Sequence, residues 1–206
     1  MSCMSAKEWL TSDLHLGEDR FAIMNRPFTT ADEHNQCLLK LHNAVVGKDD
    51  LVHLVGDAVY KNAPQYIPML KEFNGHKILY VGNHDNGLIK ELTPYFDDIV
   101  PEGDGRVLEI DGRKYWLTHY PTQGRKDMFN LVGHVHGAWK FQLNMINIGV
   151  DANHFRPTPT TAIPGMFTAI EKFYDRDVWV GNEPVNQEFV GKRGAQTRYY
   201  NPTPQA

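Results

Sequence analysis

Short apolar runs alternate with longer amphipathic segments along the first 85 residues of the chain. These runs have the length of buried strands and end at polar residues; they cover residues 9–11, 51–55 and 77–81. Between the first two runs, residues 30–46 carry apolar side chains at helical spacing, with Thr29 or Thr30 as the capping residue. Between the last two, residues 64–73 form a second helical segment that ends before Gly75. The alternation of strand and helix predicts βαβ units and a parallel sheet.

The second half of the chain has shorter apolar runs that are separated by turn residues. Residues 106–110 and 114–118 flank Asp111-Gly112, which predicts a hairpin with a tight turn. Further short strands are expected at 129–132 and 145–148, and one more hairpin at 167–173 with 178–180. This half is therefore predicted to be mostly antiparallel. Because no linker separates the halves, we expect one domain over residues 1–206.

Composition narrows the class of protein. Hydrophobic residues make up 41% of the chain and charged residues 22%, which is typical of a globular protein. Cys3 and Cys37 are too few for a disulfide framework and indicate free thiols in a reducing compartment. No apolar run approaches the roughly 20 residues of a membrane helix, and the first residues lack the apolar core of a secretory signal. We therefore expect a cytoplasmic protein with no membrane partner.

Polar side chains of a few types recur where the predicted strands end. Five of six such ends carry His, Asp or Asn at the boundary, and sites in open α/β sheets lie beyond the carboxyl ends of strands. The candidate metal ligands are Asp13, His15, Asp57, Asn83, His119, His134 and His136. Asp13 and His15 would lie on one side of an extended backbone. The glycines before Asp57, Asn83 and His134 would allow a tight turn and a close approach to an ion.

The types and number of these side chains indicate a metal centre. Carboxylate and imidazole groups suit Mn, Fe, Zn or Ni. Seven groups exceed the roughly four that one tetrahedral zinc needs, so they fit two ions better than one. Two divalent ions are the usual means of phosphoester hydrolysis, and they would attract phosphate where the net charge of −4 does not.

Taken in order, these motifs resemble the calcineurin-like metallophosphoesterase superfamily over residues 8–151. They are Asp13-x-His15, Gly56-Asp57, Gly82-Asn83-His84-Asp85, His119 and Gly133-His134-x-His136. The resemblance implies a four-layer α/β/β/α sandwich with two central mixed sheets. It also implies a motif-bearing core over about residues 8–164, beyond which residues 165–206 form an unmatched extension.

The resemblance also implies roles for the residues. Asp13, His15 and His136 would hold one ion, Asn83, His119 and His134 the other, and Asp57 would bridge them. His84 would protonate the leaving oxygen or stabilise charge there, as an imidazole with a pKa near neutrality can. Asp85 would either orient His84 or brace the turn, and both alternatives stay open.

Within the superfamily, the chain is most similar to a compact group of small phosphoesterases from bacteria and phages. It shares with them TSDLHLG, the Asn-Arg-Pro-Phe stretch that contains Arg26, GNHD and GHVHG. It lacks the Asp and Arg of the GDxxDRG motif of protein phosphatases. Glu18 is a departure from the pattern, because members of that group tend to carry a histidine at this position. The substrate specificity of the group is therefore less transferable to this chain.

The implied activity is two-metal hydrolysis of a small, nucleotide-type phosphodiester by a bridging hydroxide, with manganese as the first choice of metal. A phosphomonoesterase is the alternative, and a non-catalytic scaffold of the same fold is the alternative of another class. Arg26 is the best candidate for binding substrate phosphate and Arg125 the next. The alternative for each is a solvated surface arginine, and for Arg125 this alternative is slightly favoured. The acidic balance and the lack of a basic stripe argue against long nucleic acid as the partner.

Overall fold

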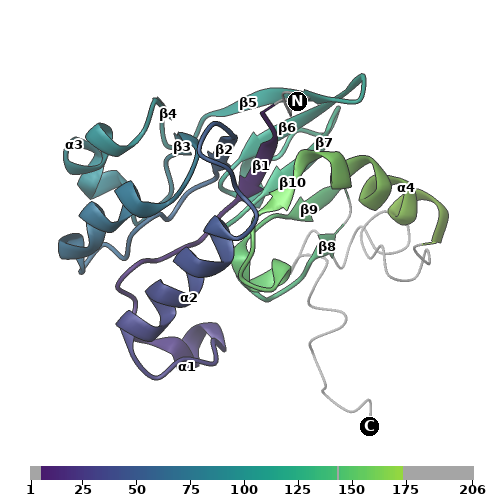
Figure 1. Ribbon diagram of the computed structural model, residues 1–206. Helices are drawn as coiled ribbons and strands as arrows, with labels where there is room; N and C mark the ends of the chain where they lie inside the picture. Colours follow the sequence, from purple (N-terminus) through teal and green to yellow (C-terminus); the bar gives the residue numbers. More distant parts are fainter. Residues whose placement is uncertain (1–5, 143, 174–206) are drawn as a thin grey trace, which may run out of the picture.

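The computed structural model describes residues 6–142 and 144–173, and its first sheet is built from the alternating segments of the N-terminal half (Figure 1). In spatial order its strands are β10 (Thr158–Pro159), β1 (Glu8–Thr11), β2 (Leu51–Leu54), β3 (His76–Tyr80) and β4 (Asp98–Val100). The neighbours from β1 to β4 pair in parallel, whereas β10 pairs antiparallel with β1. The predicted parallel sheet is therefore confirmed, and β4 and β10 are additions at its two edges.

The second sheet is formed by the C-terminal half of the motif-bearing core. Its order is β5 (Gly105–Ile110), β6 (Arg113–Thr118), β7 (Phe129–Val132), β9 (Met145–Asn147) and β8 (Phe141–Gln142). The predicted β5–β6 hairpin is confirmed, and Asp111 (φ 51°) and Gly112 (φ 73°) supply the two left-handed positions of its turn. The expectation of mostly antiparallel pairing was wrong, because β6, β7 and β9 pair in parallel through longer crossovers.

Helices α2 (Ala31–Asn43) and η1 (Pro64–Glu72) correspond to the two predicted helical segments. The Thr30 side chain caps α2 by accepting a hydrogen bond from the Glu33 backbone N–H (3.1 Å). The η1 segment is a 3-10 helix rather than an α-helix, and Pro68 within it lacks a backbone donor. The remaining helical elements are α1 (Phe21–Met24), η2 (Asn86–Leu88), α3 (Ile89–Leu92), η3 (Thr93–Tyr95), η4 (Pro121–Gln123), η5 (Val150–Asn153) and η6 (Thr160–Ala162).

Residues 163–173 form the helix α4 (Ile163–Phe173), so the hairpin strand expected at 167–173 was wrong. The apolar residues Ile163, Phe167 and Ile170 recur at intervals of three or four, which is the period of one helix face. The partner strand expected at 178–180 lies outside the described residues.

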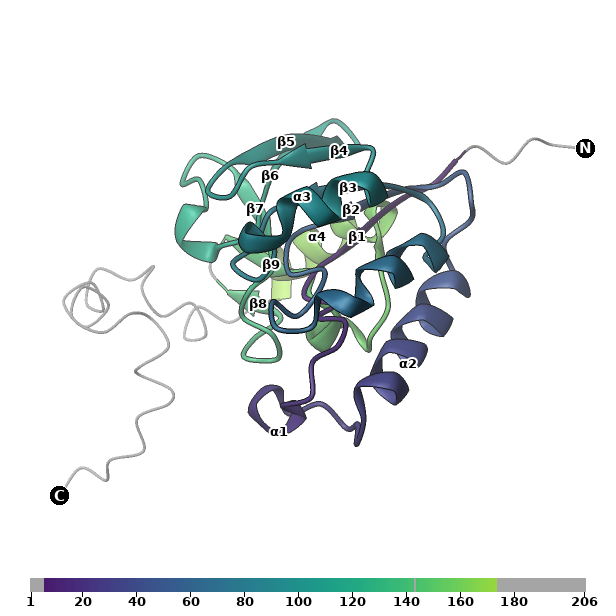
Figure 2. The same cartoon turned by 90° about the vertical axis from the view of Figure 1, so that its left-hand side faces the viewer.

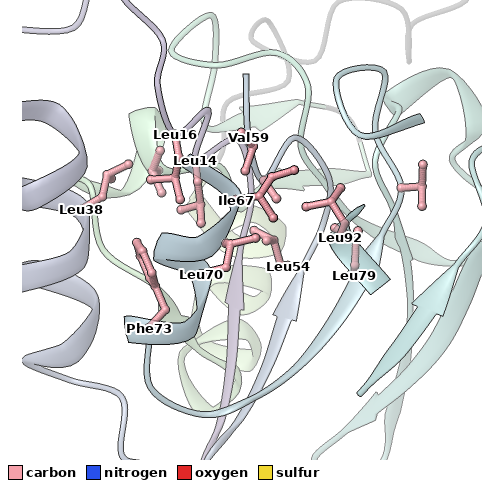
Figure 3. Packing of buried hydrophobic residues seen from close by; sticks show 13 residues of the cluster. Leu14, Leu16, Leu38, Leu54, Val59, Ile67, Leu70, Phe73, Leu79 and Leu92 are labelled. Atoms are coloured by element: carbon pink, nitrogen blue, oxygen red, sulfur yellow. The ribbon is translucent and has the colours of Figure 1, made fainter. Parts of the chain in front are cut away.

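The two larger hydrophobic clusters of the described residues hold the layers together. The first lies between the β1–β4 sheet and the helices over its outer face, where Leu38 of α2 and Leu70 of η1 pack with Leu54 of β2 (Figure 3). The second lies between the two sheets and joins Leu10 and Tyr80 to residues of β6, β7 and β9, with Ile163 and Ile170 of α4 closing it. The fold is therefore an α/β sandwich with two mixed sheets, as expected, and Figure 2 shows α2 and α3 on the helical side of the first sheet.

Within the described ranges, none of the helices has both the length and the apolar character needed to span a membrane.

Candidate metal centre

The candidate metal centre lies where the two sheets meet. The parallel strands β1, β2 and β3 and the parallel strands β6, β7 and β9 all end there, and Ser12 bridges Gly149 between the two sheets. Each motif of the sequence follows one of these strands within two residues, and His119 and GHVHG come immediately after β6 and β7. The first sheet thus supplies Asp13, His15, Asp57 and Asn83, and the second supplies the three remaining histidines.

Six of the seven predicted ligands, all except Asn83, come together with His84 in three overlapping groups. In each group one ligand atom per residue lies within 4.8 Å of the others; the groups are Asp13, His15 and His136; His15, Asp57 and His84; and Asp57, His119 and His134. Asp57 belongs to two groups and has Oδ2 3.3 Å from His15 Nε2 and 3.6 Å from His119 Nε2. The Asn83 side-chain oxygen lies 3.1 Å from His134 Nδ1 and 3.4 Å from His119 Nε2.

The backbone at this site adopts conformations that side chains other than glycine rarely take. Among the described residues, nine non-glycine residues have positive φ, and five of these are predicted ligands: Asp13, His15, Asp57, His134 and His136. The extended backbone expected at Asp13 and His15 was therefore wrong. Such strain costs on the order of 1–3 kcal/mol per residue and is concentrated at functional sites. Here it aims side chains inward immediately after each strand.

Two glycines make room for the ligands. A Cβ on Gly82 would collide with the Asp57 carboxylate and lie 2.9 Å from His119 Nε2. A Cβ on Gly133 would collide with the Ser12 hydroxyl and lie 2.9 Å from an Asp13 oxygen. The expected role of these glycines in close packing at the site is consistent with this geometry.

The His15 ring tests whether these residues fit a metal. His15 is 2% exposed, yet neither of its ring nitrogens makes a hydrogen bond within the part of the chain that the structure describes. The Asp57 oxygen at 3.3 Å is close enough for an ionic contact but is not aligned as a hydrogen-bond partner. Burying an unpaired imidazole is costly. A divalent ion held by imidazole and carboxylate would satisfy it, and the site therefore fits a metal.

Hydrogen bonds to the rest of the protein orient two of the histidines. His119 Nδ1 donates to the Val55 carbonyl (2.8 Å), which leaves Nε2 directed at Asp57. His136 Nδ1 lies 2.9 Å from Asp151 Oδ2. Partners of this kind fix the tautomer and the orientation of ligand histidines.

Arg26 does not have the position of a substrate clamp. Its side chain is buried and forms a two-point ion pair with Asp151, at 2.7 and 2.8 Å. Its remaining N–H groups contact the carbonyls of Leu14 and Asp13 and the ring of His34. Because all its donors are used inside the protein, the geometry replaces the expected phosphate contact with a role in holding Asp151.

His84 and Asp85 occupy different environments. The His84 backbone N–H donates to Asp57 Oδ1 (2.8 Å), and its ring lies edge-on to His15, with 4.4 Å between the ring centroids. Burial and the neighbouring His15 lower the pKa of His84 to about 4. Asp85 is fully buried and accepts hydrogen bonds from the backbone N–H groups of Asp57, Ala58 and Gly82, at 2.7, 2.8 and 3.0 Å. These bonds favour the turn-bracing alternative.

The charged ligands hold their protonation states for different reasons. Burial alone would raise the pKa of Asp57, but His15 and His119 outweigh it and lower that pKa below its usual range. Burial lowers the pKa of His134, with a further contribution from His119. Burial also opposes protonation of His136, but Asp151 and Asp13 outweigh it and raise the pKa. Opposite charges therefore determine the direction of the pKa shift of Asp57 and of His136, whereas burial makes the largest contribution to that of His134.

A cleft of about 640 Å³ opens beside the ligand cluster, and His15, His84 and His136 form its inner wall. Ile23 and Met24 of α1 lie on its outer wall. The cleft lining also includes Glu18 and Arg20, whereas Arg125 is not part of it and pairs with Asp127 (2.7 Å). No feature of the sequence singled out Arg20, although Glu18, two residues earlier, is a departure from the motif.

Comparisons with known proteins agree with the fold. No protein-family model matches the chain. An uncharacterized protein of Methanocaldococcus jannaschii is 29% identical over 164 residues, which cover 73% of this chain and 85% of that protein. The Gene 66 protein of Mycobacterium phage L5 is 36% identical over 80 residues, covering 37% of this chain and 39% of that protein.

Among solved structures, the chain is similar to a protein of unknown function, AQ665 from Aquifex aeolicus. The TM-score is 0.62 at 22% identity, and the match covers 79% of this chain and 100% of that one. Structures with lower similarity include the Pseudomonas putida nuclease MPE, with a TM-score of 0.44 at 20% identity over 63% of this chain and 60% of that one. A further one is an archaeal phosphodiesterase, with a TM-score of 0.40 at 19% identity over 69% and 83%. The likeness to AQ665 supports the fold, and activity has to be argued from the site.

Proposed function

We propose that this protein is a metal-dependent phosphohydrolase of the calcineurin-like metallophosphoesterase type that acts on a small, nucleotide-type phosphodiester. The observation that carries the proposal is the convergence of seven ligand side chains from both sheets around a buried His15 whose ring nitrogens lack hydrogen bonds. An arrangement this rich in carboxylate and imidazole groups is more than packing requires.

The two ion positions follow from the groups of ligands. Asp13, His15 and His136 would hold one ion, and Asn83, His119 and His134 the other, with Asp57 shared between them. When bound, divalent ions supply a nucleophile at neutral pH and neutralise charge on the phosphate. Asp151 and the Val55 carbonyl keep His136 and His119 in the orientations that this requires.

His84 is suited to hydrogen-bond the leaving oxygen as a neutral imidazole. The lowered pKa keeps the ring uncharged near pH 7. Its Nδ1 faces the Lys61 backbone N–H at 3.4 Å and therefore acts as the acceptor, which leaves the proton on Nε2 as the donor. We assign Asp85 to positioning, because its carboxylate holds the backbone of Asp57 and Gly82.

The cleft supports a small substrate. Its volume of about 640 Å³ is within the usual range for small-molecule sites. The apolar side chains of Ile23, Met24 and Pro27 on one wall offer a surface for a nucleoside or another flat group. A phosphomonoester would use the same ligands, so substrate comparison has to separate the two activities.

The test is hydrolysis of bis-nitrophenyl phosphate and of nitrophenyl phosphate by purified protein loaded with manganese, with the metal content measured in parallel. We expect diester turnover, its loss in Asp57→Asn, and a fall of about 100-fold in His84→Ala on esters with a poor leaving group. His84→Ala should keep the metal content of the wild type. His76→Ala, a change at an exposed histidine outside the cleft, serves as the control.

A preference for the monoester would replace the phosphodiesterase assignment with a phosphomonoesterase. Absence of bound metal together with absence of turnover on both esters would instead support a non-catalytic scaffold. If His84→Ala kept the full rate on a poor leaving group, the role of His84 would be wrong.

A further inference from the structure

An acid–base pair, Glu18 and Arg20, forms part of the cleft wall without belonging to the ligand cluster. Glu18 is fully buried, whereas the Arg20 side chain is about half exposed (48%). The Arg20 Nε donates to Glu18 Oε1 and its Nη2 to Oε2, both at 2.9 Å. Such a two-point pair fixes the plane of the guanidinium group.

Glu18 is itself fixed in position by hydrogen bonds. Its Oε1 also accepts the backbone N–H groups of Asp19 (3.1 Å) and Arg20 (2.9 Å). Burial alone would raise the pKa of Glu18, but the hydrogen bonds and charge of Arg20 outweigh it and lower the pKa to about 2. The pair therefore stays charged throughout the physiological pH range, and the Glu18 carboxylate accepts hydrogen bonds from four N–H groups.

Arg20 lines the cleft and has N–H groups to spare. Within the described chain, neither N–H of its Nη1 has a hydrogen-bond acceptor, and the second N–H of Nη2 is also unused. The guanidinium carbon lies 4.6 Å from the centre of the Tyr60 ring, and that ring lies 5.4 Å from the ring of His84. One aromatic ring thus separates Arg20 from the group that would face the leaving oxygen.

We propose that Arg20, oriented by Glu18 and Tyr60, binds a second anionic group of the substrate, beyond the scissile phosphate. This inference rests on the proposed function and names its substrate class: a phosphodiester that carries another phosphate or carboxylate. The scissile phosphate is served by the ligand cluster and His84, whereas Arg20 lies one ring farther along the same wall. Its free N–H groups form the planar fork that matches an oxyanion.

The experiment compares two esters that release the same nitrophenol: the nitrophenyl ester of thymidine 5′-phosphate and the same ester with a 3′-phosphate. Wild-type protein should favour the 3′-phosphorylated ester by about tenfold or more in kcat/KM, the value of one charged hydrogen-bonding contact. Arg20→Gln should remove this preference while keeping kcat/KM on the ester without the 3′-phosphate. Arg20→Lys, which keeps the positive charge but not the planar guanidinium group, should retain part of the preference for the 3′-phosphorylated ester.

Arg106→Gln is the matched control. Arg106 is similarly exposed (44%) and pairs with Asp98, but it lies outside the cleft lining. This variant should keep the full preference, and thermal unfolding of all variants should show that they are folded.

A binding measurement separates this proposal from the proposed function. Calorimetric titration with thymidine 3′,5′-bisphosphate and with thymidine 5′-monophosphate, at fixed manganese concentration, should show tighter binding of the bisphosphate only when Arg20 is present. This preference without ester hydrolysis would overturn the phosphohydrolase proposal and sustain the role of Arg20. Hydrolysis with no preference between the esters, or an equal loss on both in Arg20→Gln, would overturn the role of Arg20 and leave the phosphohydrolase intact.

Discussion

At the scale of single residues, the site depends on buried charges that hold one another in place. Arg26 connects the end of β1, through the Asp13 and Leu14 carbonyls, to Asp151, which in turn contacts His136. Asp85 connects the turn that carries Asn83 to the backbone of Asp57, because its carboxylate accepts hydrogen bonds from the N–H groups of Gly82 and Asp57. Neither side chain needs to touch the substrate for the site to depend on it.

Replacing Arg26 with methionine is expected to destabilise the protein strongly. The change would leave Asp151 buried with one partner fewer, and loss of one member of a buried ion pair typically costs about 3–5 kcal/mol. Urea unfolding of the metal-free protein measures the change. Arg106→Met, which breaks an ion pair exposed at the surface, should cost less than about 1 kcal/mol, and equal losses in the two variants would contradict the assigned role of Arg26.

Replacing Asp85 with asparagine tests whether this residue positions Asp57. Asparagine keeps one oxygen but places an N–H₂ group against backbone N–H donors, so we expect a loss of about 1–3 kcal/mol in unfolding free energy. Weaker manganese binding should accompany this loss, because Asp57 would move. Unchanged metal affinity, measured by calorimetric titration, would show that the contact with the Asp57 backbone has no functional role.

At the scale of elements, the helices on the outer face of the first sheet are held by a mixture of apolar packing and polar contacts. The ring centroids of His42 in α2 and Phe73 lie 5.1 Å apart. The Nε2 of His42 donates to the carbonyl of Asn74, which follows η1, at 2.9 Å. The contact joins the C-terminal end of α2 to the end of η1 beside the Leu38 and Leu70 core. A buried neutral histidine at this junction makes the packing of the layer sensitive to pH.

His42 should make stability fall as the pH is lowered. Burial lowers its pKa to about 4 in the folded protein, from 6.5 in the unfolded chain, so the unfolded state binds more protons between these values. Its contribution is complete above pH 6.5, is lost as the pH falls to about 4, and amounts to at most about 3 kcal/mol.

Urea unfolding at pH 7 and pH 4.5 tests this expectation in His42→Gln, which keeps a donor for Asn74. The variant should lose less stability between the two pH values than the wild type does. His76→Gln, at an exposed histidine, should behave as the wild type. If His42→Gln showed the same pH dependence as the wild type, the contribution of His42 would be disproved.

At the scale of the whole molecule, the candidate metal centre connects the two sheets. Four of its ligands follow strands of the first sheet and three belong to the second. Apart from the core between the sheets, direct pairing at this end includes the bridge from Ser12 to Gly149 and the bonds from Asp13 to the His134 backbone N–H. Bound ions would therefore join the two layers.

Manganese should raise the unfolding free energy of the wild-type protein by about 3–4 kcal/mol at 100 to 1,000 times its dissociation constant. A chelator should reverse this increase. Asp57→Asn should remove most of the increase, because it takes away a carboxylate that belongs to two of the three groups. Stabilisation of equal size in Asp57→Asn would mean that the ions bind elsewhere.

The local sequence was sufficient to predict the strands of the parallel sheet, the β5–β6 hairpin and the polar side chains that gather at the candidate metal centre. These features are local: an apolar run predicts a strand, Asp-Gly predicts a tight turn, and a polar side chain at a strand end is visible without knowing its neighbours. The strand directions of β6, β7 and β9 were not predicted, because pairing depends on where crossovers lie in space.

Only the tertiary structure decided which arginine could meet a substrate. By sequence Arg26 was the best candidate, Arg125 the next and Arg20 was none, since a guanidinium group can be buried, exposed or paired with the same local sequence. Contacts from distant parts of the chain bury Arg26 against Asp151, 125 residues away, and leave Arg20 on the cleft wall. Chemistry that resides in a residue type can be predicted from the sequence, whereas the free donors that remain after folding depend on long-range packing.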